Sequence, residues 1–258
     1  MRTMNNINSI KWFPFVFLSL LTTFSSTSKE ITVVTEYLAP YQIKNNDGSL
    51  GGFSVEVIKA LFKITGDTPL IQVLPWARAY TTAKNQKNTL IFSIAKTDSR
   101  LDKFQWVGDL LHEQYYFWAL ATNPHLKGLS LEQLKRYRVA TSRHSNENEF
   151  LIAHNFNSIY PVTSETQRTR MLYIDRTDLI IETELTLKEN TKKLKLDFTK
   201  LAKLNFVDDL ETTLSIAFNL NSDKTLVARY QQAFKQLKQS GQLLQLQQKW
   251  QIPVHHLK

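Results

Sequence analysis

The chain has 258 residues, of which 32 are Lys or Arg and 23 are Asp or Glu, so its formal net charge is +9. It contains no cysteine, which excludes disulfide bonds and a lipid-anchored thiol. The basic residues are scattered, with one cluster (KKLK at 192–195) and no interleaved aromatic residues. A solvated basic surface explains this distribution better than a nucleic-acid partner does.

The N-terminus has the organisation of a secretory signal peptide. Arg2 and Lys11 precede or flank a short apolar run, WFPFVFLSLLTTF, and small residues follow at 25–28. The run is too short to span a bilayer comfortably. We therefore expect residues 1–28 to be removed near Ser28, leaving 230 residues (258 minus 28) with a net charge of +7 (30 basic against 23 acidic). The expected location is periplasmic, without a lipid anchor; a buried N-terminal strand or helix is the alternative.

Strand and helix patterns then alternate. A β-branched run at 31–35 is typical of a buried parallel strand. Beyond Gly52, apolar residues recur at helical spacing as far as Ile64, and Gly66 supplies a stop. A strand at 70–74, a helix over 75–85 and a strand at 89–95 follow. This order predicts an α/β fold with a mostly parallel sheet and helices on its faces.

The alternation continues through the second half of the chain. We predict strands at 115–121, 138–141, 159–162, 178–181, 204–207 and 213–217, with helices near 130–136, 146–155 and 164–174 and a basic helical stretch before 204. Two helices close the sequence. The first begins after Asn221-Ser222-Asp223 and carries an apolar stripe that ends before Gly241.

Four ordered segments and the last two helices resemble one protein family. The segments are Gly51–Val57 (GGFSVEV), Ser93–Arg100 (SIAKTDSR) with the aromatic residues that follow it, Leu134–Val139 (LKRYRV) and Arg176–Ile180 (RTDLI), and the helices end at Trp250. Together they resemble, over residues 29–252, the extracellular solute-binding proteins of the polar amino acid uptake class, which have the type-II periplasmic binding fold.

The resemblance implies two lobes, each a mostly parallel sheet flanked by helices, with a ligand cleft between them. Residues 29–120 and 211–258 would form the first lobe and residues 121–210 the second, with hinge crossings near 119–122 and 208–212. Closure of the lobes around a ligand would be a hinge motion. Such a protein is expected to be a monomer without cofactor or metal.

Three residues near the end of the 89–95 strand are candidates for ligand binding. The resemblance implies that Arg100 pairs with a ligand carboxylate, a task that suits the two parallel donors of a guanidinium. A surface arginine on a turn is the alternative. Ser93 is a candidate for a hydrogen bond to the ligand, with a strand serine satisfied by the backbone as the alternative. Lys96 is a second candidate partner for a carboxylate, although a solvated lysine is the commoner outcome.

Aromatic candidates come from two loops. Trp76 stands where the family often places an aromatic wall, and Tyr37 and Tyr41 follow the first strand. Such rings cover apolar groups or stack on cations, but each also suits a core. Arg78 would serve an anionic ligand or cap its helix.

In the second lobe, the segment SRHSN at 142–146 precedes a helix. Because helix N-termini bind carboxylates, Ser145 and Asn146 are candidates, with an ordinary N-cap as the alternative.

One departure from the family affects the ligand. The amino acid binders generally have an aspartate five residues after the aspartate of the arginine–x–aspartate strand, where it holds the ligand ammonium. That count from Asp178 reaches Thr183, flanked by Glu182 and Glu184, neither of which has the expected register. The sequence therefore indicates a carboxylate-bearing, amino-acid-like solute rather than an α-amino acid specifically.

The predicted function is capture of this solute and its delivery to a membrane ABC permease. The chain has no cysteine nucleophile, HExxH, GxSxG or phosphate-binding glycine loop, and its six histidines lack metal-ligand spacing. Two alternatives stay open. A free-standing sensor for a membrane receptor is one, since the sequence to Lys258 shows no fused receptor or lytic domain. The other is a cyclohexadienyl-type dehydratase with Glu182 or Glu184 as its acid, if that residue is buried with a raised pKa.

Overall fold

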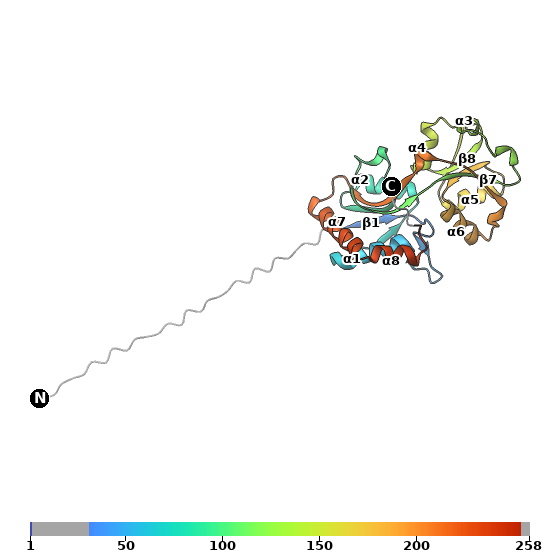
Figure 1. Ribbon diagram of the computed structural model, residues 1–258. Coiled ribbons are helices and arrows are strands. Elements are labelled where there is room, and N and C mark those ends of the chain that lie inside the picture. Colours follow the sequence, from blue (N-terminus) through green and yellow to red (C-terminus); the bar gives the residue numbers. More distant parts are fainter. Residues whose placement is uncertain (2–30, 254–258) are drawn as a thin grey trace.

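The computed structural model describes Met1 and residues 31–253. The predicted signal peptide therefore lies outside the described residues. Two five-stranded sheets, each flanked by helices, lie side by side (Figure 1). In the described part of the chain, no helix is both long enough and apolar enough to cross a bilayer.

The first sheet has the strand order β4-β1-β5-β12-β6. Its strands are β1 (Thr32–Thr35), β4 (Ile71–Val73), β5 (Thr89–Ala95), β6 (Phe104–Glu113) and β12 (Thr212–Asn219). A short ribbon of β2 (Ile43–Lys44) and β3 (Leu50–Gly51) leads into the first helix. The helices of this lobe are α1 (Phe53–Thr65), α2 (Trp76–Asn85), α7 (Lys224–Gln239) and α8 (Gln242–Lys249). The helices α1, α7 and α8 cover one face of the sheet and α2 covers the other.

The second sheet has the order β11-β7-β10-β8-β9. Its strands are β7 (Tyr116–Leu120), β8 (Arg138–Ser142), β9 (Ser158–Val162), β10 (Leu179–Glu182) and β11 (Leu201–Phe206). Its helices are α3 (Leu131–Leu134), α4 (Asn146–Ala153), α5 (Glu165–Tyr173) and α6 (Glu184–Leu194). Side chains of α3 and α4 pack on one face and those of α5 and α6 on the other. This arrangement confirms the predicted α/β architecture with helices on both faces of each sheet.

Both sheets are mixed rather than mostly parallel. In each sheet two of the strand pairings are parallel and two are antiparallel. The antiparallel pairings come from β12 in the first sheet and from β7 in the second, each of which runs against both of its neighbours. The sequence analysis also did not predict β6 as a strand. Its burial does not alternate regularly, because its pairing with β12 shifts register twice, and this hides the period-two pattern of a half-buried strand.

The chain passes between the sheets twice. The first crossing, expected near 119–122, lies instead at Gln114 and Tyr115, because residues 116–120 pair with β10 and β11 of the second sheet. The second occupies 207–211, between β11 and β12, and overlaps the expected position. The two crossings touch, since the Val207 N–H donates to the Tyr115 carbonyl at 2.9 Å.

Helix α1 has the predicted start and stop. Gly52 has φ 109°, and a Cβ there would lie 2.4 Å from the Tyr41 carbonyl oxygen, so only glycine fits this turn. Gly66 ends the helix in the left-handed conformation, and its N–H donates to the Phe62 carbonyl.

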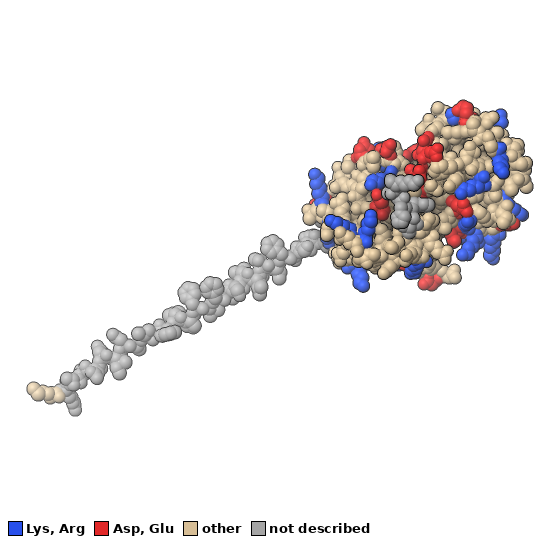
Figure 2. Space-filling view, viewed as in Figure 1, with Lys and Arg blue, Asp and Glu red and all other residues tan. Residues whose placement is uncertain are grey.

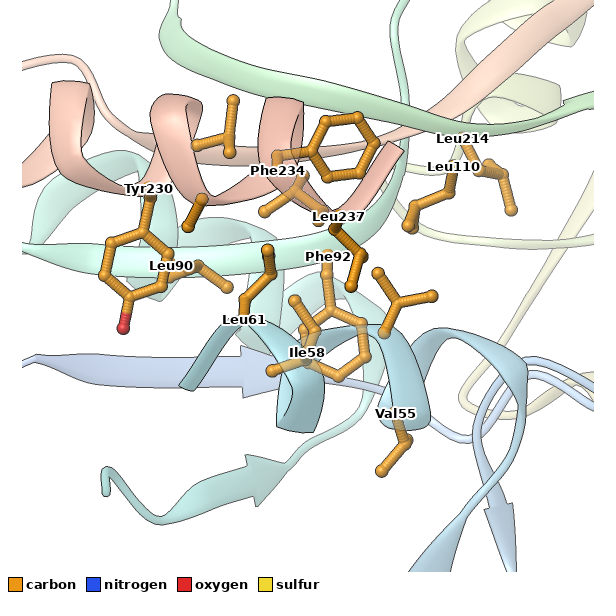
Figure 3. Close-up of a cluster of buried hydrophobic side chains, with 14 of the residues drawn as sticks. Val55, Ile58, Leu61, Leu90, Phe92, Leu110, Leu214, Tyr230, Phe234 and Leu237 are labelled. Carbon is orange, nitrogen blue, oxygen red and sulfur yellow. The ribbon is translucent and has the colours of Figure 1, made fainter. Parts of the chain in front are cut away.

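Helix α7 confirms the predicted stripe. Asp223 caps it by accepting hydrogen bonds from the N–H groups of Thr225 and Leu226. All six stripe residues are buried: Leu226, Val227, Tyr230, Ala233, Phe234 and Leu237. Figure 3 shows several of them facing the side chains of α1 and the first sheet. The first lobe is thus a packed scaffold that fixes the ends of its strands.

Candidate functional site

A small cavity lies where the two lobes meet, and both lobes line it. Its free space is about 30 Å³, enough for one or two waters. Its lining consists of Glu36, Leu38, Trp76, Ser93, Ala95, Arg100, Glu113, Tyr115, Ser145, Asn146, Glu147, Glu165, Arg168, Glu182, Thr186 and Leu214. On the face shown in Figure 2, Asp and Glu side chains gather mainly near the junction of the lobes, whereas Lys and Arg are spread over both.

The acidic side chains reach the cavity from strand ends and helix starts. Glu36 follows β1 directly, and Glu182 is the last residue of β10. Glu147 and Glu165 stand in the first turns of α4 and α5. Ends of parallel strands meet at one edge of a sheet, and helix N-termini favour carboxylates, so the fold concentrates negative charge here.

Arg168 of α5 is the centre of this acidic cluster. Its Nη1 donates to Glu147 Oε1 at 3.2 Å, and its Nη2 donates to Glu165 and Glu182. All four side chains are buried. Burial opposes the charge of Arg168, but the surrounding carboxylates outweigh it and raise the pKa of the guanidinium. Arg168 therefore stays charged and offsets part of the negative charge.

Two of the glutamates carry a cost for being charged in this cavity. Burial raises the pKa of Glu182 well above its usual range despite Arg168, and repulsion from Glu165 and Glu147 adds to the rise. Burial, followed by repulsion from Glu165 and Glu147, likewise raises the pKa of Glu36. One arginine does not compensate the carboxylates around it.

Glu113, the last residue of β6, is a further buried carboxyl group. Its Oε2 accepts a hydrogen bond of 2.5 Å from the Tyr115 hydroxyl, while its Oε1 has no hydrogen-bond partner among the described residues. Burial raises the pKa of Glu113 to about 7, although hydrogen bonds from Tyr115 and Tyr41 oppose the rise. Burial and the neighbouring Glu113 also raise the pKa of Tyr115. Glu113 is thus a buried carboxyl group near the first crossing between the lobes, and its donors are the neutral hydroxyls of Tyr115 and Tyr41.

On the other side of the cavity, the first lobe holds the loop before α4. The Trp76 Nε1 and the Arg100 Nη2 each donate to the His144 carbonyl at 2.8 Å. The Arg100 Nη2 also donates to Glu149 Oε1 at 3.0 Å, and the Ser99 hydroxyl donates to Glu149 Oε2 at 3.0 Å. We call these contacts of Trp76, Ser99 and Arg100 with His144 and Glu149 the interlobe latch.

Arg100 is the predicted carboxylate partner, and it is fully buried rather than exposed on a turn. Its guanidinium lies 5.8 Å from the ring centre of Trp76 and 5.1 Å from that of Tyr80. Its Nε has no hydrogen-bond partner among the described residues. The structure thus brings Arg100 and Trp76 together at the cavity, with part of the guanidinium committed to the second lobe.

Three further candidates also line the cavity. The Ser93 hydroxyl donates to Ser54 at 2.9 Å and accepts from Gln42, so it is held within the first lobe. Ser145 is the N-cap of α4 and accepts from the Asn148 N–H at 3.1 Å, the alternative role foreseen for it. The Asn146 Nδ2 is buried without a hydrogen-bond partner among the described residues.

The remaining candidates lie outside the cavity lining. Tyr37 and Arg78 are exposed. Lys96 forms an ion pair with Asp109, with 3.4 Å between its Nζ and the Asp109 Oδ1. Tyr41 is buried beside Glu113 in a neighbouring groove, which Thr183 and Glu184 also line. Thr183 caps α6 by accepting a hydrogen bond from the Thr186 N–H. It does not line the cavity, whereas the preceding residue, Glu182, does. Glu184 pairs with Lys188 and Lys203.

Sequence reasoning missed five charged residues of the cavity: Glu36, Glu113, Glu147, Glu165 and Arg168. A local signal existed for three of them. Glu36 follows a buried strand, and Glu147 and Glu165 fall in first turns that the sequence located. No local signal marks Arg168 or Glu113, since a mid-helix arginine and a glutamate in an unrecognised strand are ordinary residues until the fold buries them.

Comparison with known proteins agrees with this architecture. The sequence matches the family model of bacterial extracellular solute-binding proteins, family 3, over residues 31–253. No curated protein sequence matches the chain.

Solved structures show the same fold at low sequence identity. A histidine kinase sensor domain with similarity to periplasmic binding proteins has a TM-score of 0.76 and 18% identity, covering 86% of this chain and 96% of its own. The arginine-, lysine-, histidine-binding protein ArtJ from Geobacillus stearothermophilus has a TM-score of 0.74 and 18% identity, covering 86% and 95%. An ancestral arginine-binding protein bound to arginine has a TM-score of 0.73 and 16% identity, covering 86% and 97%.

Proposed function

The chain belongs to the bacterial extracellular solute-binding proteins, family 3, and from this premise we propose that it captures a small polar, amino-acid-like solute between its lobes. The observation that carries this proposal is the cavity that both lobes line with buried, charged side chains. Polar groups converging in an enclosed space are the usual means of fixing a small ligand. The membership supports binding rather than catalysis as the activity.

Capture requires the lobes to separate. The free space of about 30 Å³ admits one or two waters and no amino acid. We propose that the elements of the first sheet and those of the second move as two units about the crossings at 114–115 and 207–211. A hinge of two short crossing segments suits domain closure of this kind.

The proposed ligand contacts come from both lobes. Arg100 is proposed to meet a ligand carboxylate and Trp76 to form one wall, since both line the cavity. From the second lobe, Asn146 offers an unpartnered buried amide, and Glu182 is proposed to take the place of the family's ammonium-binding aspartate. Ser93 and Ser145 complete the polar lining.

The proposed setting is the periplasm, where the protein acts as a monomer and delivers its ligand to a membrane ABC permease. A sensory role is the second candidate. The similarity of the whole fold to a histidine kinase sensor domain favours it, because that domain shows the same architecture. Co-purification from membranes with a permease or with a receptor kinase separates the two.

A dehydratase acting on cyclohexadienyl carboxylates is less consistent with the cavity. Glu182 is buried and has a raised pKa, as such an acid requires. The cavity, however, holds five glutamates against two arginines, which opposes entry of an anionic substrate.

Thermal unfolding of the purified protein tests the binding function. The panel comprises amino acids, amines, dicarboxylates and sugar acids. A ligand at about one hundred times its dissociation constant stabilises the fold by about 2.7 kcal/mol, which raises the melting temperature by roughly 5–10 °C for a chain of this size. Stabilisation by a small set of chemically related solutes supports capture. An unchanged melting temperature across the panel contradicts it.

A further inference from the structure

We propose that the solute captured between the lobes carries a net positive charge, and that its cationic group binds beside Glu36 and Glu113; this inference rests on the proposed binding function. It concerns the charge of the ligand, which neither the family nor the fold specifies. Three features of the cavity support it.

The first feature is the balance of charge in the cavity. Five glutamates and two arginines line it, so the formal charge of the lining is −3 (two minus five). Arg100 in addition pairs with Glu149 of the second lobe at 3.0 Å. Including this partner brings the sum to −4 (−3 minus 1). This count takes every carboxyl group as ionised, a state that burial opposes at Glu36, Glu113 and Glu182. A cationic solute favours the ionised state, whereas a neutral or anionic solute leaves these groups either protonated or uncompensated.

The second feature is the way in which Arg168 distributes its hydrogen bonds. Its donors reach Glu147, Glu165 and Glu182, all in the second lobe. The carboxylates of the first lobe, Glu36 and Glu113, receive no hydrogen bond from it. The first-lobe cation of the cavity, Arg100, pairs instead with Glu149 of the second lobe. Neither arginine therefore donates a hydrogen bond to Glu36 or Glu113.

The third feature is independent of the charge count. Glu113 is 4% exposed, and the groups that hydrogen-bond it are the neutral hydroxyls of Tyr115 and Tyr41. A buried carboxylate whose donors are neutral is costly to ionise, so the site favours a cationic N–H donor from the solute. Burial raises the pKa of Glu113 to about 7, which is the response of a carboxyl group that lacks a cation.

A carboxylate on the ligand is compatible with these features without being required by them. The donors at the cavity without a hydrogen-bond partner among the described residues, Asn146 Nδ2 and Arg100 Nε, could bind such a carboxylate. The shared chemistry is thus an ammonium or guanidinium group on a molecule of net positive charge, either a basic amino acid or an amine. Ligands matched in size distinguish these two sources.

Calorimetric titration at pH 7.5 tests the proposal directly. The series comprises arginine and lysine, their decarboxylated counterparts agmatine and cadaverine, neutral glutamine and anionic glutamate. We expect binding of at least one cation and no binding of glutamate. Preference for the amino acid over its amine identifies a carboxylate subsite, and the reverse preference identifies an amine ligand.

Substitutions of the two first-lobe glutamates test where the cationic group of the ligand binds. Glu36→Gln and Glu113→Gln should each weaken binding of the cation by about thirtyfold or more, the loss typical of removing one partner of a buried charge pair. Glu132→Gln is the matched control, since this glutamate is 79% exposed on the second lobe. Circular dichroism verifies folding, and because Glu36 is only partly buried, its variant serves if Glu113→Gln does not fold.

Three outcomes would overturn the proposal, and they can be told apart. Binding of glutamine or glutamate without binding of any cation contradicts the charge inference and leaves solute capture intact. Absence of binding by every member of the series contradicts both. Unchanged affinity in both cavity variants contradicts the proposed location.

Discussion

The surroundings of Glu113 give this ordinary carboxyl group an unusual chemistry. Its side chain is buried at the first crossing, faces Tyr115 and Tyr41, and lies in the field of Glu147 and Glu165. Burial is the largest cause of the rise of its pKa from 4.5 to about 7. The folded protein therefore binds a proton that the unfolded chain has already released over much of this pH range.

This proton gives a stability prediction. Below about pH 4.5 the carboxyl of Glu113 is protonated in both states, and above about pH 7 in neither. Because the folded state binds more protons between these values, its free energy of unfolding falls as pH rises, by up to about 3 kcal/mol from this group. We therefore compare the free energy of unfolding of Glu113→Gln with that of the wild type. Relative to the wild type, the variant should be more stable at pH 8 than it is at pH 5.

Urea unfolding at both pH values, without added ligand, measures this difference. Glu36 and Glu182, whose pKa values are also raised, stay in the variant, so the comparison isolates Glu113. Glu132→Gln serves as the exposed control. Parallel pH profiles for Glu113→Gln and wild type would show that the group does not titrate in this window.

Among the structural elements, the start of α2 and the turn at 98–100 act together on the loop before α4. Both place a donor on the His144 carbonyl, which projects from a residue with φ 62°. Tyr80, also on α2, stacks on the His144 ring at a centroid distance of 5.9 Å. The interlobe latch thus joins two elements of the first lobe to one short segment of the second.

Trp76→Phe tests this latch. The variant keeps the aromatic wall but removes the indole N–H that donates to the His144 carbonyl. Loss of this hydrogen bond should destabilise the closed arrangement by about 1 kcal/mol, which lowers the closed-to-open ratio about fivefold. Small-angle X-ray scattering without ligand should show a larger radius of gyration, and ligand affinity should fall by about the same factor. Trp106→Phe is the matched control, because its indole donates at 3.1 Å to Leu101 within the first lobe. Equal effects of the two variants would argue against a latch.

For the whole molecule, the lobes form a single site whose charge depends on closure. Glu36 and Glu113 come from the first lobe, while Glu147, Glu165 and Glu182 come from the second. In the structure these like charges lie together, and burial and mutual repulsion raise several of their pKa values. A cationic ligand favours the ionised form of these groups, so its binding is linked to their protons.

Proton release on binding follows from this linkage. At pH 7 Glu113, with its pKa of about 7, is about half protonated, so binding a cation should release up to about half a proton from this group. Affinity for the cation should therefore rise between pH 6 and pH 8. Calorimetry in two buffers of different ionisation enthalpy measures the release, with Glu113→Gln as control. Identical heats in both buffers would contradict the linkage.

Local signals in the sequence determined most of the fold. Gly66, Asp223 and the apolar stripe of α7 act within a few residues of themselves, and each has the predicted role in the structure. The ordered family segments extended these local elements to a two-sheet architecture. The site was only partly predictable: Arg100, Trp76 and Glu182 reach the cavity, but Tyr37, Arg78 and Lys96 do not.

The tertiary structure alone decided the chemistry of the cavity. Glu36, Glu113 and Arg168 are far apart in sequence, and their burial and mutual field exist only once the two lobes meet. The same holds for β6, whose pairing with β12 overrides an irregular local pattern. Local propensity acts over one turn or one strand, whereas electrostatic and packing energies depend on distance in space. The sequence by itself therefore determined what the protein is built from, and the meeting of the lobes determined which charges it presents to a ligand.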